Sequence, residues 1–385
     1  MGQNFKMVAK TLFGLEELLA KELRQLGASG IEIGTRNVSF EGDTGFMYKA
    51  NLCCRTAIKI LKPITAFNIF TEEDLYKKIY DIPWEQYMEV KGTLAVNATV
   101  FSDVFTHSQY IALKTKDAIV DRFRDREGVR PDVDLDHPTL RINIHIDRNI
   151  CTVSLDSSGE SLHKRGYKLE STLAPINEVL AAGMLMLSGW TGQCDFLDPM
   201  CGSGTILAEA AMIACNIPPN LNRDEFGFET WPDFDVDLYE KIEEAALRKV
   251  RDFHFKIHGF DTDPVAVTKA KENIKNANLQ EFIEIKKQDF FESKKESDRS
   301  LYLVFNPPYD ERISVNDVEV FYSSIGNTLK HHYPGSQAWI ITSNLEALKF
   351  VGLRPSRKIK LFNGKLEAKF VRYEMYAGSR KASKQ

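Results

Sequence analysis

The spacing of apolar residues predicts a mixed α+β region over residues 1–65. Leucines recur at helical spacing between Thr11 and Leu26, so this segment is expected to form an amphipathic helix. Residues 38–40 (Val-Ser-Phe) alternate like a short strand, and 51–61 is predicted to be a second helix.

A second region, residues 66–160, is also predicted to be α/β. Thr71 precedes three acidic residues, which is the pattern of a capped helix N-terminus. The same spacing rules predict one long helix over 108–123 and strands over 93–101, 140–146 and 150–155, of which the last two form a hairpin.

After a polar linker over 156–172, the pattern changes to alternating strands and helices, which predicts a doubly wound parallel sheet. Near the end, Asn363-Gly364 between two apolar runs is a strong signal for a tight hairpin. The fold class is therefore α/β, with the parallel sheet closed by an antiparallel hairpin. The expected strands cover 194–197, 257–260, 282–285, 302–305, 358–362 and 368–376, and the expected helices cover 175–187, 205–215 and 264–277.

Composition excludes some classes of protein. The formal net charge is −4 and neither half is basic, so any nucleic-acid contact must come from local patches. There is no apolar run of membrane-spanning length and no signal-peptide layout at the start, so a soluble cytoplasmic protein is expected. The 6 cysteines form no Cys-x-x-Cys pair, so we expect neither a zinc site nor a disulfide framework, and no metal.

Two stretches are locally basic. Lysines and arginines between 114 and 130 are interleaved with acids, which favours a solvated face with internal ion pairs. Between 354 and 372, seven cations stand against Glu367 alone, so this stretch is the better candidate for phosphate contacts, with an ordinary polar surface as the alternative. The aromatic-rich insertion over 221–236 is expected either to face a substrate or to cover the core.

The first candidate site follows the strand predicted over 194–197 and reads Asp198-Pro199-Met200-Cys201-Gly202-Ser203-Gly204-Thr205. Two glycines two residues apart let the backbone turn sharply and approach a ligand closely. The third glycine of a dinucleotide-binding loop is missing, so a diphosphate cradle is not predicted.

Two further sites lie after the next two strands. Asp261, in the run Asp261-Thr262-Asp263, is placed to accept hydrogen bonds from both ribose hydroxyls of a nucleoside, whereas Asp263 is a candidate either for the ligand or for a helix cap. Asp289 with Phe290 follows the third strand, where a carboxylate would accept from an adenine amine and an aromatic ring would flank the base.

The fourth site is Asn306-Pro307-Pro308-Tyr309, directly after an apolar strand. Two consecutive prolines hold the chain stiff and remove two backbone donors. The side-chain carbonyl of Asn306 and the backbone carbonyl of Pro307 are then available to accept from an exocyclic amine, and Tyr309 offers a face for stacking a flipped base.

The second half, with these four sites in this order, resembles a class I S-adenosylmethionine-dependent methyltransferase of the amino-methylating group. It is most similar to the bacterial family that methylates the 2-amino group of a guanine in 23S ribosomal RNA. The runs Leu162–Tyr167 and Ala174–Glu178, the loop Asp198–Thr205 and the turn Asn363-Gly364 carry this resemblance. Residues 66–160 resemble a THUMP RNA-binding domain, and 1–65 resemble the ferredoxin-like domain that precedes it, which leaves 161–385 as the Rossmann-like methyltransferase domain.

The resemblance implies a cofactor, S-adenosylmethionine (product S-adenosylhomocysteine), and an RNA partner. It implies that the glycine loop lines the methionine end of the cofactor, Asp261 holds the ribose, and Asp289 the adenine. The catalytic residues would be Asn306, Pro307, Pro308 and Tyr309, and the cofactor-binding residues would be Pro175, Asp198, Met200, Cys201, Gly202, Gly204, Thr205, Asp261, Thr262, Asp263, Asp289, Phe290 and Asn306.

The mechanism expected is direct in-line transfer, in which positioning matters more than a strong base. The four-residue motif does not distinguish guanine from adenine, or RNA from DNA. A methyltransferase for an adenine 6-amino group or a transfer RNA guanine is the alternative enzyme. A non-catalytic RNA-binding protein with a vestigial cofactor fold is the alternative of another class.

Overall fold

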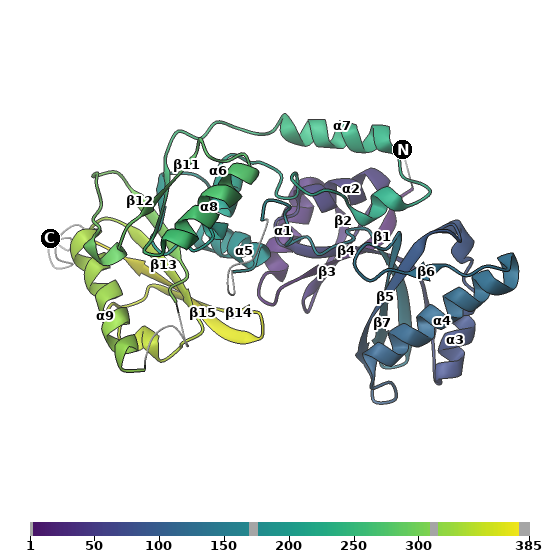
Figure 1. The fold of residues 1–385 in the computed structure, drawn as a ribbon. Coiled ribbons are helices and arrows are strands. Elements are labelled where there is room, and N and C mark those ends of the chain that lie inside the picture. The colour runs from purple at the N-terminus through teal and green to yellow at the C-terminus, as the bar shows by residue number, and fades with distance from the viewer. Residues whose placement is uncertain (1–2, 169–175, 309–314, 377–385) are drawn as a thin grey trace. The chain divides into compact units, whose positions relative to one another are not determined.

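The computed structural model describes residues 3–168, 176–308 and 315–376. The chain divides into two compact units, each built from several stretches of sequence (Figure 1). Unit 1 comprises Met1–Thr11, Leu19–Leu162 and Arg223–Ala245, and unit 2 comprises Leu12–Leu18, His163–Asn222 and Ala246–Gln385. The chain therefore passes between the units five times, and neither unit is one continuous piece of sequence.

Unit 1 is built on one mixed sheet of eight strands in the order β2-β3-β1-β4-β8-β7-β5-β6. Helices α3 and α4 pack against each other, and α4 also packs against β5 (Figure 1). The strands are β1 Phe5–Thr11, β2 Ser29–Gly34, β3 Asn37–Gly42, β4 Ala57–Asn68, β5 Thr93–Phe101, β6 Asp132–Val133, β7 Leu140–Asp147 and β8 Ile150–Asp156. The helices are α1 Glu16–Leu26 (whose first turn belongs to unit 2), α2 Thr44–Cys53, α3 Glu72–Tyr80, α4 Ser108–Glu127 and α7 Val236–Leu247, with short 3-10 turns η1 Trp84–Gln86 and η2 Gly227–Thr230.

The prediction of a helix over 51–61 is wrong. Helix α2 begins earlier, because Asp43 caps it by accepting from the Phe46 N–H at 2.8 Å, and it ends at Cys53. The chain then enters β4, which pairs with both β1 and β8 and continues to Asn68. One long strand therefore crosses the expected boundary between residues 65 and 66 and joins the two N-terminal regions into a single sheet. The predicted cap of α3 is confirmed, since Thr71 and Asp74 form a reciprocal capping box.

The basic stretch of α4 is largely engaged in ion pairs within unit 1. Arg122 donates to both carboxylate oxygens of Glu85, at 2.7 and 2.9 Å, and lowers the pKa of that carboxyl to about 2. Arg124 pairs with Asp121 at 2.9 Å, and Lys114 with Glu73 at 3.8 Å. The Arg124–Asp121 pair is of the internal kind that the interleaved acids favoured, whereas Glu73 and Glu85 lie outside α4 and Arg122 is buried instead of solvated.

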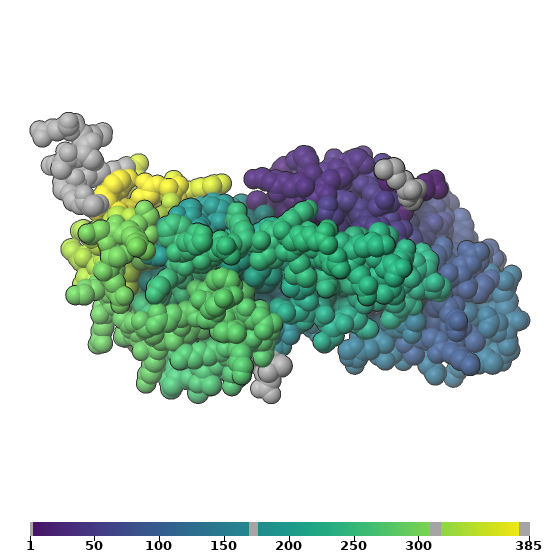
Figure 2. All heavy atoms as spheres, turned by 90° about the horizontal axis from the view of Figure 1, so that it is seen from above, coloured from purple at the N-terminus to yellow at the C-terminus, as the bar shows by residue number. Residues whose placement is uncertain are grey.

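The insertion within the second half of the sequence belongs to unit 1. Its Phe228 ring stacks on Tyr48 with centroids 4.3 Å apart, and Arg223 donates to the backbone carbonyls of Ser158, Glu160 and Ser161. A Cβ atom on Gly227 would lie 2.6 Å from the Asp156 carbonyl oxygen, so only glycine fits this close approach. Helix α7 contributes no fully buried residue and lies at the surface in Figure 2. Of the two expectations for this insertion, covering the core is the one that the structure supports.

Unit 2 is a seven-stranded sheet in the order β11-β10-β9-β12-β13-β15-β14, with β9 to β13 parallel and β15 antiparallel to both of its neighbours. This is the expected parallel sheet closed by an antiparallel hairpin. The strands are β9 Asp195–Asp198, β10 Ile257–Asp261, β11 Ile283–Lys287, β12 Leu301–Phe305, β13 Gln337–Thr342, β14 Arg357–Asn363 and β15 Leu366–Glu374. The helices are α5 Glu178–Ser188, α6 Thr205–Ala214, α8 Pro264–Asn276 and α9 Val315–His332, with short 3-10 turns η3 Phe290–Glu292 and η4 Ala347–Lys349.

A fully buried polar network holds together the His163–Asn222 stretch of unit 2. The Arg165 guanidinium donates to the Glu209 carboxylate at 3.1 Å and to the Asn220 side-chain carbonyl at 3.0 Å. The Arg165 and Glu209 side chains have no exposed surface, so removing one partner would leave an uncompensated charge in the core. Arg165, which lies within the predicted linker over 156–172, is thereby fixed to α6.

Candidate functional site

Four of the predicted site segments follow the carboxyl ends of neighbouring strands in unit 2. Strand β9 lies at the centre, with β10 and then β11 on one side and β12 on the other. The chain adds β10 and β11 on one side of β9 and then β12 and β13 on the other. This change of side makes β9 a topological switch point, the usual place for a ligand in an open parallel sheet. The parallel registers of β9 with β10 and β12 bring Asp198, Asp261 and Asn306 to the same edge.

The glycine loop after β9 is held in a tight turn. Gly202 and Gly204 have φ angles of +51° and +81°, which favour glycine. The loop is anchored to β10 by a hydrogen bond from the Cys201 N–H to the Phe260 carbonyl oxygen, 2.8 Å. It is also held from α8, where buried Asn273 donates to the Ser203 carbonyl oxygen at 3.0 Å. Sequence reasoning missed Asn273, since a polar residue on a helix gives no sign of what it contacts.

Asp261 fixes the position of this loop. One oxygen of its carboxylate accepts from the Gly202 N–H at 2.9 Å, and the other accepts from the Asp263 N–H at 3.0 Å. The side chain is only partly buried, and the neighbouring Thr262 is exposed. Asp261 can therefore hold the loop and still present lone pairs to a ligand.

Asp263 has a different role from Asp261. Its carboxylate accepts from the Val265 N–H at 2.9 Å and caps α8, which begins with Pro264. Of the two roles considered for this residue, the structure supports the helix cap.

Asp198 is the most buried acid of the site, with 1% of its surface exposed. Burial raises the pKa of the Asp198 carboxyl well above its ordinary value, the Met200 N–H at 3.2 Å acts in the opposite direction, and the Asp261 carboxylate raises it further. Burial likewise raises the pKa of the Cys201 thiol, so Cys201 fills space in the loop as a neutral thiol. A buried carboxyl next to a second acid is suited to a cationic ligand group.

Asp289 and Phe290 follow β11 at the next strand end. Asp289 is partly buried and accepts from the Phe291 N–H at 2.8 Å. Phe290 is 2% exposed and packs against Phe305 and Tyr333 in the core beneath the site. Its ring therefore does not flank a ligand, and the flanking role predicted for it is corrected: any contact with a ligand is through its backbone.

Asn306 follows β12 and carries an unsatisfied polar atom. Its side-chain oxygen is buried and has no hydrogen-bond partner among the described residues. A buried carbonyl without a donor costs free energy, so this oxygen at a strand end is a candidate to accept from a ligand. Pro307 is buried and Pro308 partly buried beside it, whereas Tyr309 and Pro175 lie outside the described residues.

Ser343 is a further candidate that sequence reasoning missed. It directly follows β13, the strand next to β12, and its buried hydroxyl also lacks a partner within the described part of the chain. The polar run Ser343-Asn344 after an apolar strand was the available signal.

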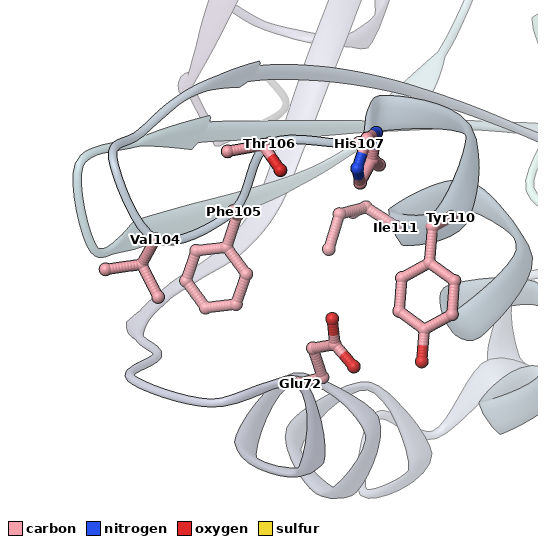
Figure 3. A pocket seen from close by; sticks show the side chains of 7 residues that line it. All are labelled: Glu72, Val104, Phe105, Thr106, His107, Tyr110 and Ile111. Atoms are coloured by element: carbon pink, nitrogen blue, oxygen red, sulfur yellow. The ribbon is translucent and has the colours of Figure 1, made fainter.

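Other features of the described residues do not compete with this site. A hollow of about 210 Å³ lies in unit 1, with Glu72 from α3 facing Tyr110 and Phe105 (Figure 3). Within residues 3–168, 176–308 and 315–376, no cluster of His, Cys, Asp and Glu is arranged to hold a metal ion. None of the helices in those same ranges is long and apolar enough to span a membrane.

Three family models match successive parts of the chain. The RlmL ferredoxin-like domain matches residues 6–61, the THUMP domain matches 70–156, and the RMKL-like methyltransferase domain matches 165–372. The last match alone covers more than half of the chain.

Named relatives agree with these models. The chain is 38% identical to "Ribosomal RNA large subunit methyltransferase K/L" of Syntrophotalea carbinolica, over 97% of this chain and 54% of that protein. It is 37% identical to "Putative RNA methyltransferase slr0064" of Synechocystis, over 94% of this chain and 95% of that protein. The chain thus spans about half the length of the K/L relatives it matches.

The fold is also shared with solved structures. One, described as "a putative methyltransferase complexed with SAH", superposes with a TM-score of 0.86 at 30% identity, covering 98% of this chain and all of the other. With its ferredoxin-like and THUMP domains before a class I methyltransferase fold, the chain belongs to the RMKL-like methyltransferase family.

Proposed function

We propose that this protein transfers a methyl group from S-adenosylmethionine to the exocyclic 2-amino group of a guanine in RNA, with 23S ribosomal RNA as the substrate. The observation that carries the proposal is the buried oxygen of Asn306 at the end of β12, which has no hydrogen-bond partner among the described residues. Such an acceptor is complementary to an amine, which brings two donors. The names of the relatives, which refer to ribosomal RNA of the large subunit, support the choice of substrate.

The residues present fit S-adenosylmethionine. The buried Asp198 carboxyl would accept from the ammonium group of the methionine end, lined by Met200, Cys201, Gly202, Gly204 and Thr205. Asp261, with Thr262 beside it, would accept from the ribose hydroxyls, and Asp289 from the adenine amine. When bound, the cofactor supplies a sulfonium methyl group that is already strongly electrophilic.

The chain's own residues then position the nucleophile. The Asn306 oxygen and the Pro307 carbonyl would each accept a hydrogen bond from one N–H of the target amine, which makes its nitrogen more tetrahedral and aims the lone pair. Pro307 and Pro308 fix the backbone φ angles here, so that the two acceptors are held before the base arrives. Tyr309 would stack on the target base. Because the amine loses its proton after attack, the proposal requires no strong general base.

Binding of S-adenosylmethionine is expected to release a proton through Asp198. The pKa of this carboxyl is raised in the folded protein without ligand, so below that raised pKa the acid carries a proton. A cationic ammonium group favours the ionised form, so affinity should rise with pH and level off above the raised pKa. Stability without ligand has the opposite trend, falling as pH rises from the unfolded value through the raised one.

Calorimetry in buffers of different ionisation enthalpy measures this proton release. D198N should remove it and weaken binding, whereas D263N, which changes only the cap of α8, should keep it. Wild-type binding without proton release at any pH tested would contradict the assignment of Asp198.

Mass spectrometry of nucleosides from a deletion strain tests the function itself. Ribosomal RNA, transfer RNA and DNA are digested separately, and the strain is complemented with wild type or N306A. The proposal expects one N2-methylguanosine of 23S ribosomal RNA to disappear and to return only with wild type. Loss of methylated adenine, or loss from transfer RNA, would favour the alternative enzymes, and absence of cofactor binding by the purified protein would favour a vestigial site.

A further inference from the structure

The closing hairpin of unit 2 carries an exposed aromatic pair. Phe13, from the short stretch of unit 2 that precedes α1, meets Phe362 of β14 edge to face, with ring centroids 5.4 Å apart. Phe13 is 39% exposed and Phe362 is partly exposed. Pairs of aromatic side chains in proteins usually pack in the core. A pair that stays exposed to solvent is therefore a candidate contact surface for another molecule.

The position of Phe13 is fixed by its neighbour. Gly14 has a φ angle of +87°, and a Cβ atom there would lie 3.3 Å from both the Lys360 carbonyl oxygen and the Leu361 side chain. The next residue, Leu15, packs onto Gly183 of α5, where an added Cβ atom would lie 2.6 Å from the Leu15 side chain. The segment is therefore seated closely along β14, the edge strand of the sheet, and Phe13 is held in place before any ligand arrives.

Lysines surround this aromatic pair. Lys358, Lys360 and Phe362 alternate along β14 and so share one face of the sheet, and the Lys360 ammonium lies 5.4 Å from the centre of the Phe362 ring. On β15, Lys369 stands directly opposite Lys360. Like charges directly opposite each other are unfavourable in a sheet, and a bound anion relieves the repulsion.

One acid on these strands faces the same surface. Glu367, opposite Phe362, pairs with Lys360 at 2.6 Å, but both side chains are about half exposed, so the pair contributes little. The two arginines on these strands have partners elsewhere. Arg372 forms an ion pair with Glu374 at 2.6 Å, and Arg357 donates to the Leu187 carbonyl oxygen at 3.4 Å. On β14 and β15 themselves, the positive charge is thus concentrated on Lys358, Lys360 and Lys369.

This surface lies toward the carboxyl ends of the parallel strands, where Asn306 is located. In the sheet, Lys369 of β15 lies opposite Thr342, the last residue of β13. Strand β13 lies next to β12, which leads directly into Asn306. With β14 three strands away from β12, the spacing between strands places the aromatic pair about 15 Å from the Asn306 end of β12 across the sheet. A nucleic acid with its target base at Asn306 would reach the hairpin within a few nucleotides.

We propose that Phe13 and Phe362, with Lys358, Lys360 and Lys369, form a hairpin platform that binds unpaired RNA next to the target nucleotide. A base stacks on the aromatic pair, and the lysines contact the flanking phosphates. The combination of an open aromatic face with exposed lysines fits single-stranded nucleic acid, in which each nucleotide brings both a π face and a negative charge. This inference rests on the proposed function and adds to it the surface that positions the substrate.

The test measures binding of a fluorescently labelled, unstructured oligoribonucleotide to the full chain, apart from catalysis. F13L/F362L keeps the apolar contact but removes the stacking faces, and should weaken binding about tenfold. K358Q/K369Q should weaken binding and make its salt dependence shallower. Affinity for S-adenosylmethionine and kcat on saturating RNA should stay unchanged, while KM for RNA rises.

F255L and K330Q are the matched controls. Phe255 of unit 2 is 37% exposed, similar to Phe13, but it precedes β10 and so lies at the amino ends of the parallel strands. Lys330 is an exposed lysine of α9. Both variants should bind RNA like wild type. If the leucine pair proves unstable, the lysine variants still decide the question through the salt dependence.

The proposal is overturned if both platform variants bind the oligonucleotide with wild-type affinity and salt dependence. It is also overturned if they lose binding to anionic lipid vesicles while binding of RNA is intact. Failure of the proposed function would give a different result, namely oligonucleotide binding that depends on the platform but no methyl transfer to any RNA.

Discussion

Replacing Asn306 with alanine should lower the rate of methyl transfer by about 10²–10³-fold, comparable to the loss of one preorganised hydrogen bond to a reacting group. Affinity for S-adenosylmethionine should stay within about twofold, since under the proposal the essential contact of Asn306 is with the target amine. Single-turnover kinetics with RNA in excess, together with calorimetry of cofactor binding, measure the two quantities separately.

The stability of N306A distinguishes a catalytic role from a structural one. The Asn306 oxygen is buried and has no partner among the described residues, so its removal should not destabilise the protein. N306D, which keeps an acceptor at the same position, should recover part of the activity. A lower melting temperature together with an equal loss of activity and cofactor affinity would mean that Asn306 supports the fold instead.

Replacing Asp261 with alanine should raise the Kd for S-adenosylmethionine by about 100-fold or more. Two hydrogen bonds that the ribose hydroxyls would donate to the Asp261 carboxylate would be lost, each worth about 1.5–3 kcal/mol. The Gly202 N–H would also lose its acceptor, so the glycine loop would lose its fixed position. Isothermal titration of wild type and variant with the cofactor measures the change.

D263A is the control for this prediction. Asp263 lies two residues away and caps α8, so its loss should cost about 1 kcal/mol of stability with little change in cofactor affinity. Similar affinity losses in D261A and D263A would show that both act only by holding the loop and helix in place.

The strand ends of unit 2 could be predicted from the sequence because short apolar runs there stop at residues with special backbone behaviour. Leu301–Phe305 ends at two prolines, and Asp195–Asp198 leads into two glycines with positive φ. In a parallel sheet the order of such segments already brings their ends to one edge. The positions of Asp198, Asp261 and Asn306 therefore followed from local patterns and one rule of topology.

Features that depend on distant contacts could not be predicted in this way. Residues 57–61 became part of β4 because β1 and β8 lie on either side of it, and no pattern within 51–61 records that pairing. The burial of Phe290 depends on Phe305 and Tyr333, which lie farther along the chain. Strand β13, which lies between β12 and the closing hairpin, was not predicted either, although the four residues between Gln337 and Thr342 are all apolar.

The repeated passage of the chain between the units bears on how the protein folds during its synthesis. Arg223–Ala245 completes unit 1 by bringing Phe228 onto Tyr48 and Arg223 onto the carbonyls that follow β8. These residues leave the ribosome after β9 and α6 of unit 2, well past the midpoint of the 385-residue chain. Nascent domains usually fold in order from the N-terminus. Here unit 1 cannot complete its packing until residue 245 has been synthesised, so the aromatic surface around Tyr48 stays uncovered until after β9 and α6 of unit 2 have emerged.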